Sequence, residues 1–463
     1  MSPEHVTHLN PWVASLLSAL IPGVGHVYAG DRDRGVRLIG IDVALVVLFG
    51  ISVLFFQTEV LKVWASLPSL SLVMVGNLVL LSYRGWAAYD AFQMVEGPSS
   101  ATSKGLAVVL GAVVWLVVLM PHAAVGYYNI VQYSLISEVF AASPGPVTAT
   151  ADTGTGDTSS GSISGTTIPQ TAIWDGLERL NILLMGSDVG AGREGVRTDT
   201  MIVMSIDPET GDTAMISLPR NFSGIDLPEG YGVWDCDCFP QLLNDLFLVA
   251  TKNPDWFPGA GEPGPRAIKT TIGHLLDLEI HYYALVNLDG FIGIVDALGG
   301  VDIEVPNTII DETYPHEDGV TIESVTIEEG PQHLDGHLAL AYARIRRHAD
   351  DFARMNRQRC VLGAVMAQSS PIELLSSYGA IAEVLKETLL TDIPQDRLVD
   401  FIDLLPVISF DRVGVLHIDR EYISGIDTGR TYYDQDRIHS ETQTILADPT
   451  AAHDGLSLEN TCD

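Results

Sequence analysis

The feature that most constrains the fold of this chain is a set of three long apolar runs within its first 140 residues. They span residues 36–56, 63–82 and 106–122, and the last continues to residue 130. Each approaches the ~20 residues that an α-helix needs to cross the core of a bilayer. A buried helical bundle fits poorly, because these runs lack the polar face of a bundle helix. We therefore predict an all-α membrane region.

A fourth apolar segment, residues 11–28, is shorter and is interrupted by Pro22-Gly23. It is compatible with a tight crossing, a re-entrant hairpin or a helix lying on the membrane surface. The membrane region, residues 1–140, is therefore expected to hold three or four transmembrane helices.

Basic residues beside the apolar runs predict the orientation in the membrane. Arg32, Arg34 and Arg37 crowd one short loop. Arg84 and Lys104 flank a second loop. Basic loops favour the cytoplasmic side, so the chain is expected to leave the membrane outward. We predict a multi-pass protein of the cell membrane with its second domain outside the cell.

The charge of the chain is concentrated in its second part. The formal net charge is −34, yet the first 140 residues hold 6 basic and 8 acidic side chains. The remaining residues therefore carry a net charge of −32. Nucleic acid is not expected as a primary partner, because a phosphate backbone requires a basic face.

Composition also separates a linker from a folded domain. Residues 141–171 are almost entirely Ser, Thr, Gly, Ala and Pro, a composition that cannot bury a core. We expect this linker to be disordered or loosely extended. A folded domain is then predicted over residues 172–463.

Apolar runs and helical spacing alternate along that domain. Strands are predicted at residues 180–185, 200–206, 213–218, 282–288 and 301–305, with the second and third forming a hairpin. Helices are predicted at residues 265–276, 291–298, 334–343 and 352–368. The expected fold class is α/β, with a mixed α+β sheet sandwiched by helices.

Two aspartates lie at the ends of the predicted strands. Asp188 follows the strand over 180–185 and Asp199 precedes the strand over 200–206, so pairing of these strands brings both carboxylates together. Such a pair is repulsive unless a cation lies between its members. Mg²⁺ suits one or two carboxylates together with phosphate oxygens. Two turn-capping aspartates are the alternative interpretation.

A cluster of arginines reverses the acidic character of the domain locally. Six of its 19 basic residues fall within 16 positions: Arg344, Arg346, Arg347, Arg354, Arg357 and Arg359. Guanidinium groups bind two phosphate oxygens at once, whereas surface ion pairs would contribute only ~0–1 kcal/mol each. The cluster therefore favours an anionic ligand over intramolecular ion pairs.

Helical spacing places part of this cluster on one face. Arg354, Arg357 and Gln358 are spaced i, i+3 and i+4. Val361 and Leu362 lie on the opposite face and are expected to pack on the core. We expect the polar residues to lie at the rim of a site, so that replacing them leaves the domain folded.

A series of ordered motifs resembles the LytR–CpsA–Psr family of cell-wall glycopolymer ligases. The motifs include Gly186-Ser187-Asp188, Arg197-Thr198-Asp199-Thr200 and Pro219-Arg220. Further matching segments occur at residues 289–291, 296–302, 330–336, 341–346, 350–354 and 357–359. The resemblance is strong over residues 175–370 and weaker to about residue 450.

The resemblance implies a reaction and a site. Such proteins move a glycopolymer from a polyprenyl-pyrophosphate carrier to peptidoglycan through a phosphodiester bond. Asp188 and Asp199 would hold Mg²⁺ on the pyrophosphate. The phosphates would be bound, and the leaving-group charge spread, by Arg197, Arg220, Arg344, Arg346, Arg354, Arg357 and Gln358. Asp199 is a candidate general base, unless the acceptor hydroxyl needs little help.

The sequence departs from the family over residues 234–264, where an Asn-Ala-rich helix is usual and only Asn244 matches. The cysteines are Cys236, Cys238, Cys360 and Cys462. Because C-x-C neighbours seldom bridge each other, Cys360 or Cys462 is expected as the partner in any disulfide. A zinc site is not favoured without a CxxC pair, and His281 and His316 are expected to be surface or core residues.

Two other functions use the same residues. A pyrophosphatase would cleave the carrier lipid with water as acceptor, and the sequence does not distinguish it from a ligase. A membrane-anchored polyprenyl-phosphate or glycopolymer receptor would need the arginines but not the aspartate pair. For either enzyme we expect an apolar cleft for the lipid beside the arginines, formed around residues 282–298.

The predicted orientation has a direct test. Protease added to intact cells should release the second domain by cutting within residues 141–171, because that segment is expected outside the cell. Cutting only after lysis would contradict the orientation.

Overall fold

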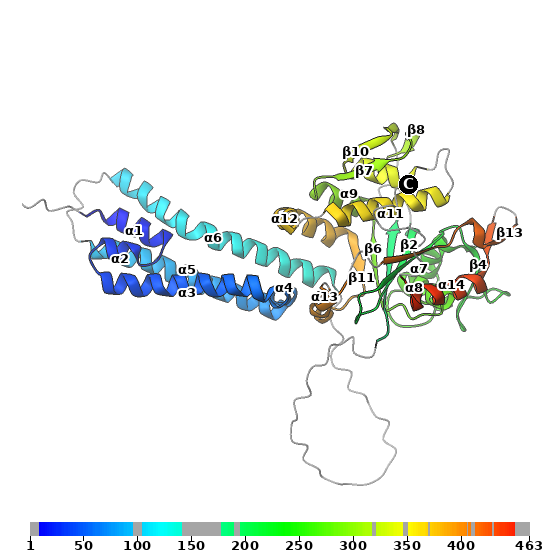
Figure 1. The fold of residues 1–463 in the computed structure, drawn as a ribbon, viewed down its shortest axis with the longest axis horizontal. Coiled ribbons are helices and arrows are strands. Elements are labelled where there is room, and N and C mark those ends of the chain that lie inside the picture. The colour runs from blue at the N-terminus through cyan, green and yellow to red at the C-terminus, as the bar shows by residue number, and fades with distance from the viewer. Residues whose placement is uncertain are drawn as a thin grey trace, which may run out of the picture. The chain divides into compact units, whose positions relative to one another are not determined.

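The computed structural model describes residues 9–95, 104–140, 177–188, 195–316, 321–345, 351–368, 371–404, 406–408, 413–427 and 430–449 (Figure 1). It divides into two compact units, Met1–Ser137 and Glu138–Asp463. The predicted linker, residues 141–171, lies outside the described ranges.

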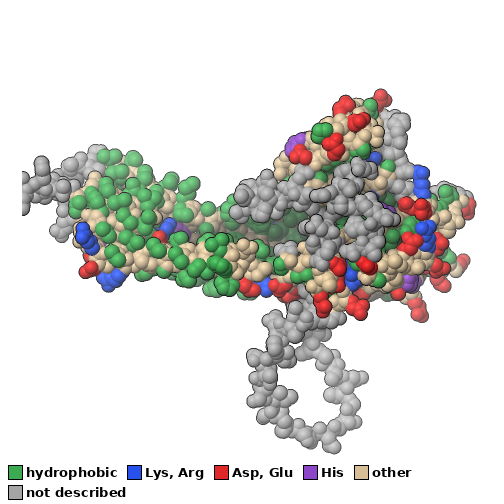
Figure 2. Space-filling view, viewed as in Figure 1, with side chains coloured by type: hydrophobic (Ala, Val, Ile, Leu, Met, Phe, Trp, Pro, Cys, Tyr) green, Lys and Arg blue, Asp and Glu red, His purple; other side chains and the backbone are tan. Residues whose placement is uncertain are grey.

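The first unit is helical. Its elements are α1 (Pro11–Leu20), α2 (Val24–Tyr28), α3 (Arg32–Phe55), α4 (Gln57–Ala65), α5 (Leu67–Met94) and α6 (Lys104–Val139). Among the described residues, three helices are long and apolar enough to cross a membrane: α3, α5 and α6. Large apolar side chains cover the outside of this unit in Figure 2, as expected of helices that face lipid.

Two boundaries in this unit differ from the sequence-based expectation. The membrane helix that contains the second apolar run, α5, begins at Leu67 rather than Val63, because Pro68 is favoured in the first turn of a helix. The segment 11–28 folds as two short helices separated at Pro22-Gly23. With ten residues, α1 is about 15 Å long, half the thickness of a bilayer core.

The second unit contains a mixed six-stranded sheet with the order β11-β6-β1-β2-β3-β12. Its strands are β1 (Leu180–Ser187), β2 (Thr198–Ile206), β3 (Thr213–Leu218), β6 (Tyr282–Val286), β11 (Leu389–Thr391) and β12 (Val413–His417). β2 runs antiparallel to both β1 and β3, β6 is parallel to β1 and antiparallel to β11, and β12 is parallel to β3. The predicted α/β class and the hairpin of the second and third strands are confirmed.

Helices cover both faces of this sheet, because its central strands carry apolar side chains on both faces. Leu183 and Val203 face a core that includes α7 (Leu246–Lys252), α8 (Pro263–Leu276) and α14 (Gln435–Ala447). On the other face, Leu184 and Ile202 lie in a smaller cluster with Leu362 of α11 (Asp351–Gln368). The predicted helix at 352–368 is therefore confirmed.

The remaining helices and strands complete the second unit. The helices are α9 (Leu288–Ala297), α10 (Gly336–Arg344), α12 (Pro371–Thr388) and α13 (Leu398–Leu404). Two-stranded sheets are formed by β4 (Ser223–Asp226) with β5 (Cys238–Leu242), β7 (Val301–Val305) with β10 (Gly330–Leu334), β8 (Ile309–Pro315) with β9 (Ile322–Ile327), and β13 (Ile423–Asp427) with β14 (Arg430–Tyr433).

The cysteine expectation was wrong. Cys236 and Cys238 bridge each other, because the chain between them turns back and brings their Cα atoms to 5.0 Å, within the range of a disulfide. Cys360 is buried in α11, and Cys462 lies outside the described residues.

Candidate functional site

The strand order brings the predicted site residues to one edge of the sheet. β1 and β3 end at this edge, and β2 starts there because it runs in the opposite direction. Asp188 therefore directly follows β1, Asp199 is the second residue of β2, and Arg220 lies two residues after the end of β3. The pairing of Ser187 with Thr198 closes the β1–β2 connection beside both carboxylates.

Asp199 is the most connected of these residues. Its Oδ1 lies 2.7 Å from the Arg220 guanidinium and accepts a 3.4 Å hydrogen bond from the Asn244 amide. Arg354 donates to the backbone carbonyl of Asp199 at 3.2 Å. Burial alone would raise the pKa of Asp199, but Arg220, Arg354 and Asn244 outweigh it and hold that pKa below its ordinary value.

Asp188 and Arg197 hold each other in place through two hydrogen bonds. The Asp188 amide donates to the Arg197 carbonyl at 3.1 Å, and the Arg197 amide donates to Asp188 Oδ1 at 3.2 Å. The Arg197 side chain donates to Asp245 Oδ1 at 2.7 Å, and this bond raises the pKa of Arg197. Arg197 therefore stays charged while its position is held from both ends.

The helices contribute Arg344 and Arg354. Arg344, the last residue of α10, donates to the Tyr314 hydroxyl at 3.2 Å, and its guanidinium lies 5.7 Å from the centre of the Tyr314 ring. Arg354 on α11 is only 2% exposed. The expectation that the whole set lies at a polar rim was therefore wrong for Arg354, because α11 packs directly on the sheet face.

These residues line one polar cavity of about 350 Å³. Its lining consists of Asp188, Arg197, Asp199, Arg220, Asn244, Asp311, Tyr314, Pro315, Arg344, Ile345 and Arg354. Four arginines thus face three aspartates around one space. Guanidinium groups in such an arrangement can bind an anion, and the carboxylate oxygens beside them can bind a cation.

Two predicted residues, Arg357 and Gln358, do not line this cavity. The Arg357 side chain donates to the backbone carbonyls of Tyr342 and Ile345 at the end of α10. It therefore caps that helix, while Gln358 lies about 100° further round α11 and lines the neighbouring cavity. Arg346 lies outside the described residues.

Three residues of the site were not predicted from the sequence. Asp245 holds Arg197, whereas Asp311 and Tyr314 come from β8 and form one wall of the polar cavity. Only the neighbourhood of Asn244 gave a signal, since that position matched the family. β8 has no regular alternation of buried and exposed residues and no motif that would mark it as part of the site.

A second cavity of about 320 Å³ opens beside the first. Its lining is largely apolar and includes Leu184, Ile202, Ala284, Val286, Leu288, Phe291, Leu340 and Leu362. Asp199, Arg344 and Arg354 line both cavities. The expected apolar cleft beside the arginines, formed in part by residues 282–298, is confirmed.

The donor set of the polar cavity fits a hard divalent cation. Asp188 and Asp199 each present a carboxylate to the same space, and no thiolate or imidazole is among the described lining residues. Mg²⁺ typically uses one or two carboxylates and keeps its other positions for water and phosphate oxygens.

The fold and site define an α/β domain, joined to candidate membrane helices, with an aspartate–arginine site at the edge of its sheet. The model of the LytR_cpsA_psr family matches residues 148–447. The chain belongs to this family.

Its curated relatives carry transferase names. The chain is 30% identical over 220 residues to "Polyisoprenyl-teichoic acid--peptidoglycan teichoic acid transferase TagU" of Halalkalibacterium halodurans, covering 47% of this chain and 62% of that protein. It is 26% identical over 262 residues to TagU of Bacillus subtilis, covering 55% and 72%. For TagV of Bacillus subtilis the values are 30% over 218 residues, covering 46% and 49%. The chain thus spans less than two thirds of the length of the first relative.

A solved structure is also similar to part of the chain. The crystal structure of Bacillus subtilis TagV covers 58% of this chain and 98% of that one, with 24% identity and a TM-score of 0.43.

The lowered pKa of Asp199 predicts how stability depends on pH. A carboxylate whose pKa is lowered by folding stabilises the fold above its ordinary pKa of ~3.9, and this contribution is lost as the pH falls through the lowered value. Asp199→Asn should lower the free energy of unfolding by about 1–3 kcal/mol at pH 7. The difference from wild type should shrink below about pH 4. Denaturant titrations of the full chain between pH 7 and pH 3 measure this.

The matched control is Asp302→Asn, which changes an exposed carboxylate on the same unit. It should alter the stability little at either end of the range. A pH-independent effect of Asp199→Asn would contradict the role assigned to the Asp199–Arg220 pair.

Proposed function

We propose that this chain is a phosphotransferase that moves a glycopolymer from a polyprenyl-pyrophosphate carrier to a cell-wall acceptor, peptidoglycan. The acceptor hydroxyl attacks the phosphorus that bears the glycopolymer. A phosphodiester forms to the acceptor, the pyrophosphate bridge breaks, and polyprenyl phosphate leaves. The names of the relatives point to a teichoic acid as the glycopolymer class.

The observation that carries this proposal is the shared wall of the two cavities. A polyprenyl-pyrophosphate has an apolar chain joined directly to a doubly charged head. The polar and apolar cavities adjoin in the same way, with Asp199, Arg344 and Arg354 common to both linings. Each volume lies near the lower end of the range of small-molecule sites.

The charge of the polar cavity supports a pyrophosphate ligand. Four arginines and three aspartates line it, which gives a formal excess of one positive charge. A pyrophosphate diester carries two negative charges, so a divalent cation held by the aspartates would restore a positive balance. As charge develops on the leaving phosphate, fixed guanidinium groups stabilise it without rearranging.

Asp188 and Asp199 are the residues that would hold Mg²⁺. When bound, the ion would neutralise charge on the pyrophosphate oxygens. The hydrogen bond from the Arg197 amide orients the Asp188 carboxylate, and Arg220 keeps Asp199 ionised.

The same contacts argue against Asp199 as the general base. A carboxylate whose pKa is lowered is a weaker proton acceptor than an ordinary one. We assign Asp199 to cation binding, and the acceptor hydroxyl loses its proton to solvent late, once its bond to phosphorus is forming.

The location proposed for this reaction is the outer surface of the cell membrane. The candidate membrane helices α3, α5 and α6 provide the anchor. The basic residues are not in loops as expected. Arg32, Arg34 and Arg37 begin α3, Arg84 lies in α5 and Lys104 begins α6. Their positions near these helix ends support a cytoplasmic location for the start of α3 and for the α5–α6 connection. The catalytic unit would then face the peptidoglycan.

Substitutions at the polar cavity should separate cation binding from phosphate binding. Asp188→Ala and Asp199→Ala should each lower Mg²⁺-dependent transfer by about 100-fold or more. Arg344→Ala should lower it through weaker phosphate binding, and Arg344→Lys should recover only part, because an ammonium cannot form the bidentate fork. The measurement is the transfer rate of the full chain as a function of Mg²⁺ concentration.

Asp302→Asn serves as the matched acidic control and should keep the wild-type rate. Thermal melts accompany each variant, above all Arg354→Ala, whose buried side chain also contributes to stability. Wild-type rates in either aspartate variant, or a reaction independent of Mg²⁺, would contradict the cation-assisted mechanism.

The apolar cavity predicts a separate effect on the lipid. Ala284→Phe adds a ring at the cavity wall, so it should raise the KM for carriers with a long polyprenyl chain by about tenfold or more, as expected when ~1–2 kcal/mol of apolar burial is lost. The kcat with a short-chain analogue should change little. An equal effect on long and short chains would contradict lipid binding in this cavity.

A further inference from the structure

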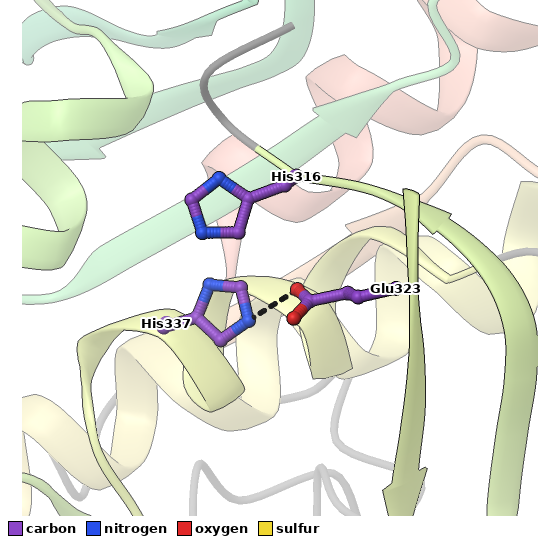
Figure 3. Close-up of side chains that lie close together, drawn as sticks. All are labelled: His316, Glu323 and His337. Atoms are coloured by element: carbon purple, nitrogen blue, oxygen red, sulfur yellow. Dashed lines mark ion pairs between the residues drawn. The ribbon is translucent and has the colours of Figure 1, made fainter. Parts of the chain in front are cut away.

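Two histidines and a glutamate come together away from the aspartate–arginine site. His316 directly follows β8, Glu323 lies in β9, and His337 lies in the first turn of α10. Figure 3 shows both imidazole rings and the carboxylate directed toward one another. One nitrogen of each ring and one carboxylate oxygen all lie within 4.8 Å of one another.

We propose that His316, Glu323 and His337 form a binding site for a zinc ion. Two imidazole nitrogens and one carboxylate oxygen are a ligand set that Zn²⁺ uses, with water in the fourth position. Hard cations such as Mg²⁺ and Ca²⁺ prefer oxygen ligands alone, so this site differs in chemistry from the aspartate pair.

The geometry of the three side chains is close to that of such a site. In a tetrahedral zinc site with bonds of about 2.0–2.1 Å, the ligand atoms lie about 3.4 Å apart. His337 Nε2 now lies 2.7 Å from Glu323 Oε1, and the two rings are stacked with their centroids 5.2 Å apart. Side-chain rotations that move the ligand atoms by about an ångström would bring all three to the required spacing.

The state of the Glu323 carboxylate also points to a ligand. Its Oε1 atom is buried and lies 2.7 Å from His337 Nε2. A buried carboxylate oxygen needs a positively charged or hydrogen-bonding partner. A bound cation would satisfy this oxygen, and the strongly acidic domain would raise the local concentration of cations.

The position of the cluster suggests a positioning role. β8 also carries Asp311 and Tyr314, which line the polar cavity, and the Tyr314 ring packs edge-on against His337. α10 carries both His337 and Arg344, and Arg344 donates to Tyr314. An ion at this site would therefore tie the β8–β9 hairpin to α10 and hold this wall of the cavity in place.

The zinc content of the full chain in detergent, without a polyhistidine tag or reductant, tests this site. After removal of metal and dialysis against Zn²⁺, wild type should retain one equivalent more than His316→Ala, Glu323→Gln or His337→Ala. Co²⁺ in place of Zn²⁺ should give the visible absorption of a tetrahedral site in wild type only. Zinc should raise the melting temperature of wild type and not that of the three variants.

The matched control is His333→Gln, because His333 and Asp302 form a similar histidine–carboxylate contact of 2.7 Å without a second histidine. This variant should keep the full zinc content. Absence of zinc from wild type, or equal zinc content in wild type and the three ligand variants, would overturn the proposal. Melting curves without metal identify any variant that is unfolded. If the alanine variants are unfolded, Glu323→Gln still tests the site, because glutamine has nearly the same shape as glutamate. The readouts do not depend on the proposed transfer reaction.

Discussion

The antiparallel position of β2 between β1 and β3 is the constraint on which the site depends. Because neighbouring strands run in opposite directions, the end of β1, the start of β2 and the end of β3 meet at one edge of the sheet. Asp188, Asp199 and Arg220 are near neighbours for this reason. The helices that cover one face then add Arg344 and Arg354, and β8 closes the remaining side.

Bringing these charges together requires that they compensate one another. Burial alone would raise the pKa of Asp199, yet that pKa is lowered, because Arg220, Arg354 and Asn244 outweigh the effect of burial. The buried Arg354 is in turn held by the backbone of Asp199. Fixed arginine and aspartate charges thus line the site before any ligand binds. Phosphoryl transfer depends on such preorganised charges.

Much of this arrangement could be predicted from the sequence because its signals are local. Apolar runs marked β1, β2 and β3, and ordered motifs marked the aspartates and most arginines. The role of Arg357 was less accessible, since a shared helix face does not reveal that the carbonyls ending α10 attract its guanidinium.

Features that depend on long-range packing were not visible in the sequence. β8 has partly exposed, charged residues without a clear alternation, so neither Asp311 nor Tyr314 could be assigned to the site. His316, Glu323 and His337 follow no metal-binding spacing, and only the β8–β9 pairing and the start of α10 bring them together. The Cys236–Cys238 bridge depends on a local turn that residue spacing alone did not favour.

The most direct measurement is the identity of the products. The full chain, supplied with a polyprenyl-pyrophosphate glycolipid, Mg²⁺ and peptidoglycan fragments, is analysed by mass spectrometry. The proposed transfer yields a peptidoglycan fragment that carries the glycan through one phosphate, with an equal amount of polyprenyl monophosphate. Free glycan phosphate with unmodified peptidoglycan would indicate a pyrophosphatase, and intact glycolipid bound to the protein would indicate a receptor. Either result would contradict the proposed transfer.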